Sequence, residues 1–221
     1  MQLIEKIQKS TSAIERKRLI QENKKSEEEY SKALSALSTA VSSLTNSLDV
    51  AAEMKSSHLI ETPLLSQETK TELLEYADSC GKGVFEGSLT LDMVNAFKAK
   101  GDAYAAQVRV VWKDAASVYS EGPRGYLSII GGLTDNPHKA AHLAESINKT
   151  TNGDPSVASI RKLVADVAVA KTITDAFSLS PEIEDFLKKV SLQQATVTDI
   201  TPKVMSWLNG KKLTNKLKIR F

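Results

Sequence analysis

Residues 30–51 read YSKALSALSTAVSSLTNSLDVA, and this stretch decides the fold class. Its larger apolar residues recur in alternating steps of four and three, at Tyr30, Leu34, Leu37, Val41, Leu44, Leu48 and Ala51. On an α-helix this spacing places all of them on one narrow stripe, which is the pattern that packs knobs into holes against another helix. The residues between them are mostly Ser, Thr, Lys and Ala, which tolerate water. The stretch therefore predicts a coiled-coil-like helix.

The residues upstream keep a helical spacing but lose the apolar stripe. Ile7 and Ile14 are spaced for one helix face, whereas Arg16 and Asn23 fall on stripe positions. A helix that is polar nearly all round either bridges solvent or needs a partner. We therefore expect residues 1–61 to form a long N-terminal helical arm, as one helix or as two nearly collinear ones.

A second stripe repeats the alternation of three and four, at Val94, Phe97, Gly101, Tyr104, Val108, Val111, Ala115 and Val118. Glycine in a helix interior costs about 1 kcal/mol relative to alanine. Gly101 is therefore interpreted as a point of close approach to another helix, with a mild kink as the alternative. The simplest pairing lays this helix antiparallel on the first, with residues 62–88 as the return. The alternative is a homodimeric coiled coil that forms through the same stripes.

Prolines mark the remaining helix starts. A capping residue precedes five of them, at Thr62-Pro63, Asn136-Pro137, Asp154-Pro155, Ser180-Pro181 and Thr201-Pro202. A side-chain oxygen at the N-cap accepts a free N–H, and proline suits the first helical position because its missing N–H would have gone unpaired. The pair Gly122-Pro123 predicts a loop after the second long helix, and Asn209-Gly210 predicts a helix end. We expect Trp112 and Trp207 to anchor the core.

Together these patterns predict an all-α fold. Long N-terminal helices form a hairpin over residues 1–61 (the arm) and 62–121 (the return helix and the second long helix). A bundle of shorter helices with a basic tail follows over residues 122–221. Strands and helices do not alternate as they do in α/β enzymes.

The last six residues depart from helical spacing. Lys216-Leu217-Lys218-Ile219-Arg220-Phe221 alternates charged and apolar residues, which is typical of a β-strand. A short terminal strand needs an edge to pair with. Within this chain the candidate edge is Val84-Phe85-Glu86. The alternatives are a sheet edge of another protein or a solvated terminus.

The tail also carries the only marked charge asymmetry, because no acidic residue follows Asp199. The candidate partner-binding residues are Lys211, Lys212, Lys216, Leu217, Lys218, Ile219, Arg220 and Phe221. Their chemistry fits an acidic protein surface or phosphate groups.

Composition narrows the function classes. The chain has 221 residues, a formal net charge of +2 and a single cysteine, Cys80. It has no apolar run near the roughly 20 residues that cross a bilayer, so we expect a cytoplasmic protein without a membrane segment. His138, His142 and Glu145 share a helix face, but Lys139 stands where a metalloprotease helix carries glutamate. Gly81-Lys82-Gly83 lacks the spacing of a phosphate-binding loop and is expected to be a flexible loop.

These observations favour a non-enzymatic interaction or assembly subunit of a cytosolic complex, without a catalytic, cofactor or metal site. Its arm and basic tail would dock another protein. The alternative is a nucleic-acid-binding helical accessory protein that uses the basic residues of the tail.

Overall fold

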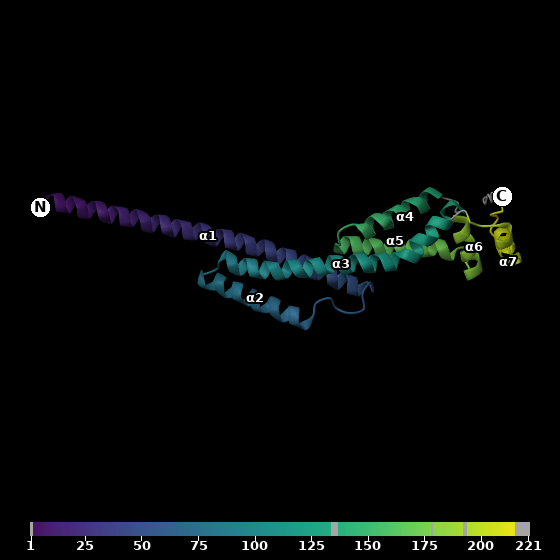
Figure 1. Ribbon diagram of the computed structural model, residues 1–221, viewed down its shortest axis with the longest axis horizontal. Coiled ribbons are helices and arrows are strands. Elements are labelled where there is room, and N and C mark those ends of the chain that lie inside the picture. Colours follow the sequence, from purple (N-terminus) through teal and green to yellow (C-terminus); the bar gives the residue numbers. More distant parts are fainter. Residues whose placement is uncertain (1, 134–136, 178, 192–193, 215–221) are drawn as a thin grey trace. The chain divides into compact units, whose positions relative to one another are not determined.

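The computed structural model describes residues 2–133, 137–177, 179–191 and 194–214 (Figure 1). Its helices are α1 (Gln2–Ser56), α2 (Gln67–Glu86), α3 (Leu91–Ile130), α4 (Pro137–Asn152), α5 (Val157–Asp175), α6 (Pro181–Ser191) and α7 (Pro202–Gly210), with the 3-10 turns η1 (Gly131–Leu133) and η2 (Val197–Asp199). The described residues contain no strand, which confirms the predicted all-α fold. The strand expected over Lys216–Phe221 lies outside the described residues.

The chain divides into two compact units. Unit 1 consists of Met1–Asp49 and Pro63–Gln107, and unit 2 consists of Val50–Thr62 and Val108–Phe221. Helices α1 and α3 therefore contribute to both units.

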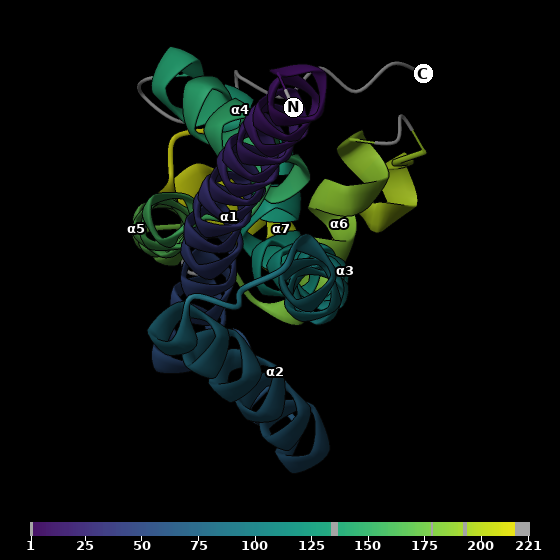
Figure 2. The same cartoon turned by 90° about the vertical axis from the view of Figure 1, so that its left-hand side faces the viewer.

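In unit 1, α1 and α3 run parallel rather than antiparallel. Tyr30 lies beside Thr90, immediately before α3, and further along both helices Leu44 faces Gly101. Figures 1 and 2 both show α3 beside α1 in this unit. The expected antiparallel pairing of the two long helices is wrong because α2 reverses the chain once and the turn after it reverses the chain again. The hairpin is formed by α2 and α3.

The turn between α2 and α3 corrects two sequence predictions. Gly81-Lys82-Gly83 and Val84-Phe85-Glu86 both belong to the last turns of α2, and form neither a loop nor a strand. Gly87 ends the helix with a left-handed φ of 68°, and the Ser88 N–H donates to the Gly83 carbonyl at 2.8 Å. Glycine adopts this conformation without a steric cost, so the helix continues up to it.

Unit 2 is built around α3 to α7. One core cluster of this unit is formed by Ile130, Leu133, Ile183, Phe186, Leu187, Val204, Leu208 and Leu213. Trp112 is fully buried and donates from Nε1 to the Gly153 carbonyl at 3.1 Å, which confirms it as a core anchor. Trp207 is half-buried beside the core cluster and donates to the Phe177 carbonyl at 2.8 Å.

Three of the five proline-marked helix starts are confirmed, since α4, α6 and α7 begin at Pro137, Pro181 and Pro202. The other two helices begin later. The N-caps of α2 and α5 are Ser66 and Ser156, whose hydroxyls accept the N–H three residues ahead. A serine cap satisfies a helix N–H directly, so these helices begin after the serine rather than at the upstream proline.

Helix α3 continues through Gly122-Pro123, where the sequence predicts a loop. Proline removes one helix hydrogen bond and costs about 3 kcal/mol in a helix interior. Downstream, Leu127 and Ile130 are almost fully buried. Burying two such side chains contributes roughly 3–6 kcal/mol, which offsets the cost of the proline.

Candidate protein-interaction site

The predicted stripe on α1 is only partly used inside the molecule. Ala33 and Ala40 are buried in the unit 1 core, and Tyr30, Leu37 and Leu44 pack against it. Ala51, at the end of the stripe, is also buried, whereas the three remaining members, Leu34, Val41 and Leu48, are 38%, 46% and 36% exposed. We call these three residues the α1 ridge. The helix is rotated from the expected orientation because small alanines let neighbouring helices approach more closely than leucine does.

The α1 ridge lies in a stretch without formal charge. No Asp, Glu, Lys or Arg occurs between Lys32 and Asp49. The ridge residues recur every seven positions, so they stay on one line along about 21 Å of helix. The adjoining residues are mostly Ser, Thr and Ala. This surface presents three apolar knobs among small uncharged side chains.

Before the ridge, α1 continues toward the N-terminus. Figure 1 shows this part of the helix extending past the turn between α2 and α3. Lys17, Gln21 and Lys25 are exposed. The single long helix over Gln2–Ser56 confirms the predicted helical character of the arm.

The structure describes only the start of the basic tail. The Lys211 ammonium donates to the Ala176 carbonyl at the end of α5, at 2.8 Å. Lys212 has a left-handed φ of 56°, and Leu213 is buried in the unit 2 core. The other candidate tail residues, Lys216, Leu217, Lys218, Ile219, Arg220 and Phe221, lie outside the described residues.

A cleft of about 250 Å³ opens at the turn between α2 and α3. It is lined by Ser26, Glu29, Tyr30, Gly87, Ser88, Leu89 and Thr90. The Tyr30 hydroxyl donates to the Val84 carbonyl at 3.1 Å and fixes the ring beside α2. Sequence reasoning missed this cleft because its residues come from α1 and from a turn 57 or more positions later, and no local spacing relates them.

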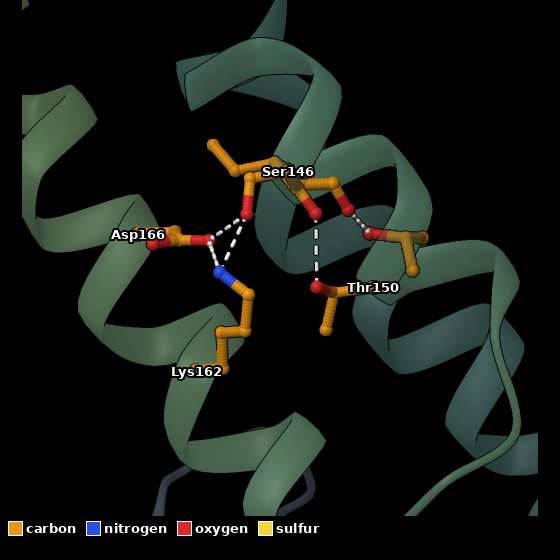
Figure 3. Close-up of polar contacts among 6 residues, drawn as sticks. Ser146, Thr150, Lys162 and Asp166 are labelled. Atoms are coloured by element: carbon orange, nitrogen blue, oxygen red, sulfur yellow. Dashed lines mark hydrogen bonds and ion pairs between the residues drawn. The ribbon is translucent and has the colours of Figure 1, made fainter. Parts of the chain in front are cut away.

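A polar cluster joins α4 to α5 in unit 2 (Figure 3). The Ser146 hydroxyl donates to Asp166 Oδ2 at 2.7 Å and accepts from Lys162 Nζ at 2.6 Å. Lys162 also pairs with Asp166 at 2.9 Å. The serine hydroxyl and the two charges satisfy one another, so the cluster clamps the two helices together.

A second ionic contact ties the end of α1 to α5. Arg161 donates from Nε and Nη2 to the two carboxylate oxygens of Glu53, at 3.0 and 2.9 Å. This bidentate hydrogen bond is the main reason that the pKa of Glu53 is lowered. Burial raises the pKa of the Cys80 thiol, which disfavours the reactive thiolate.

His138, His142 and Glu145 all lie exposed on α4. Among the described residues, no three His, Cys, Asp or Glu side chains are arranged to hold a metal ion. None of the described helices is both long enough and apolar enough to cross a membrane.

No protein-family model matches the chain, and neither a curated protein nor a solved structure shows significant similarity to it.

Proposed function

We propose that this protein is a non-enzymatic interaction subunit that binds a partner protein through α1. The observation that carries the proposal is the α1 ridge, in which Leu34, Val41 and Leu48 stay exposed at seven-residue intervals. The opposite flank of the same stripe packs into the unit 1 core, so this part of the helix is held in place. A fixed helix with a regular apolar line supports docking of a second helix.

The surface defines the chemistry of the partner. The partner presents a helix with apolar residues at alternating steps of three and four, so that its side chains fit between the ridge residues. Small or uncharged residues beside this apolar line match the uncharged stretch that surrounds the ridge. A strongly charged helix loses hydration there without gaining an ion pair.

The ridge alone does not account for a stable complex. Full burial of an exposed Leu or Val side chain contributes about 1.5–3 kcal/mol. In the folded protein the three ridge side chains are still about two fifths exposed, so a partner can bury only that fraction. Covering all three therefore contributes roughly 2–4 kcal/mol, whereas a micromolar complex needs about 8 kcal/mol. The partner must therefore also bury surface outside the ridge.

A site-specific photocrosslinker placed at Val41 tests the proposal in cells. We expect a discrete protein adduct at Val41 and none at Asn46, which lies on the other side of the helix. The double variant L34D/L48D should abolish the adduct. The matched variant T39D/N46D adds the same charge to exposed positions away from the ridge and should retain it. Equal crosslinking at both positions, or an adduct that survives L34D/L48D, would contradict the proposal.

The nucleic-acid alternative predicts a different result. Binding through phosphate contacts weakens steeply as salt concentration rises, whereas an uncharged helix contact does not. Retention of DNA or RNA that falls with salt, and that is lost in the variant K211Q/K212Q/K216Q/K218Q, would favour the alternative.

A further inference from the structure

The cleft beside the turn between α2 and α3 has the chemistry of a site for a basic segment. Among the described residues, Glu29 is the only charged one that lines it, and 61% of the Glu29 side chain is exposed. The hydroxyl groups of Ser26, Ser88 and Thr90 add hydrogen-bond acceptors. The ion pair of Glu29 with Lys25, at 3.8 Å, is long and exposed, so it holds the carboxylate only weakly.

Two exposed apolar side chains lie close in sequence to the lining residues. Phe85, two residues before the lining residue Gly87, is 92% exposed, and Leu91, directly after Thr90, is 40% exposed. Covering an aromatic ring of this size gives a large hydrophobic gain. A ligand that reaches beyond the acceptor-rich pocket to these side chains therefore gains apolar contact as well.

Apart from Lys25, several acidic residues lie close in sequence to the lining residues. Glu27 and Glu28 precede Glu29 on α1, Glu86 ends α2 and Asp92 lies in the first turn of α3. All four are exposed. Their combined field attracts a basic ligand and repels an acidic one.

The C-terminal tail of this chain has the complementary pattern. Lys216, Lys218 and Arg220 alternate with Leu217, Ile219 and Phe221, and no acidic residue follows Asp199. The described chain is fixed by the buried residue Leu213 and leaves seven further residues after Thr214. Fully extended, seven residues reach about 25 Å, which is enough to lie across a cleft of another molecule.

We propose that this cleft binds the Lys216–Phe221 tail of a second copy of the protein. The basic side chains face Glu29 and its acidic neighbours, and the apolar side chains cover Phe85 and Leu91. Such a contact joins two different surfaces, so a pair of copies keeps one free cleft and one free tail and can add further copies. The inference rests on the proposed role as an assembly subunit, but it uses a surface separate from the α1 ridge.

Complementation of variants tests this contact. We expect the molar mass of the full chain, measured by sedimentation velocity, to rise with protein concentration. The variant E29K/F85S reverses the pocket charge and removes the exposed ring, and K216E/K218E/R220E reverses the charge of the tail. Each should weaken self-association at least tenfold, and added salt should weaken that of the unaltered chain. The matched variant E75K changes an exposed α2 carboxylate away from the cleft and should leave self-association unchanged.

Mixing the two defective proteins gives the decisive result. One retains a functional tail and the other a functional cleft, so the mixture should form a one-to-one dimer that neither protein forms alone. No dimer in the mixture, or a full chain that stays monomeric throughout, would overturn the proposal. L34D/L48D should self-associate normally, so failure of the ridge and failure of the cleft give separate results.

Discussion

Two buried glycines of unit 1 should respond in opposite directions to the same substitution. Gly101 lies in the middle of α3, and a Cβ atom added there would meet the Leu44 side chain at 3.8 Å, an ordinary van der Waals distance. Gly83 lies near the end of α2, where an added Cβ would lie 3.1 Å from the Leu89 Cα. That atom belongs to the backbone and cannot rotate away.

The expected magnitudes follow from these distances. Replacing glycine by alanine within a helix contributes about 1 kcal/mol through backbone entropy alone. Gly101→Ala should therefore stabilise the protein by about 1 kcal/mol. At Gly83 the same gain is opposed by overpacking, which typically costs 1–3 kcal/mol. The net effect of Gly83→Ala should be a loss of about 1 kcal/mol.

Thermal unfolding followed by circular dichroism measures both effects. For a chain of this length, 1 kcal/mol corresponds to a shift in Tm of about 2–4 °C. We expect the Tm to rise in Gly101→Ala and to fall in Gly83→Ala. A lower Tm in Gly101→Ala would refute the inference that an added Cβ atom fits beside Leu44. A higher Tm in Gly83→Ala would refute the tight approach of α2 to Leu89.

Three further predictions concern caps, acid stability and the clamp between helices. His58 and Lys212 adopt left-handed φ angles of 57° and 56° just after α1 and α7. Glycine adopts this conformation without the steric cost of a Cβ atom, so His58→Gly and Lys212→Gly should each stabilise the protein by about 1 kcal/mol. Urea unfolding measures this change in the free energy of unfolding. Hydrogen bonds from Lys189 and Thr196 lower the pKa of Asp199 from 3.8 to about 2. Because the folded state holds the Asp199 carboxylate ionised at a lower pH than the unfolded chain does, this carboxylate contributes its full stability above about pH 4 and loses it as the pH falls toward 2. The urea midpoint of Asp199→Asn should accordingly depend less on pH within that window, and an unchanged pH dependence would contradict this. Ser146→Ala should cost about 1 kcal/mol, because Asp166 and Lys162 lose the hydroxyl between them, and a neutral result in the same assay would argue against a clamp.

The two proposals describe separable routes of assembly. The α1 ridge is apolar and uncharged, so its contacts should resist salt. The cleft and the tail carry opposite charges, so their contact should weaken as salt screens them. Salt concentration alone therefore separates the two routes in one preparation.

Individual helices could be predicted from local spacing because helix formation depends mainly on residues three or four positions apart. The long α1, the second helix through Gly101 and the starts at Pro137, Pro181 and Pro202 follow from this local rule. Other boundaries could not be predicted. Continuation of α3 through Pro123 depends on the burial of Leu127 and Ile130, and the helix at Val84–Glu86 depends on the turn at Gly87.

Residue spacing alone was enough to predict a helical protein whose N-terminal helix carries a regular apolar stripe. Which half of that stripe is covered depends on how the helices pack. Small alanines let α1 pack closely on its neighbours, so Ala33 and Ala40 enter the core while Leu34, Val41 and Leu48 stay at the surface. Spacing along a helix defines an apolar face, but which flank of that face meets water depends on how closely distant segments can approach.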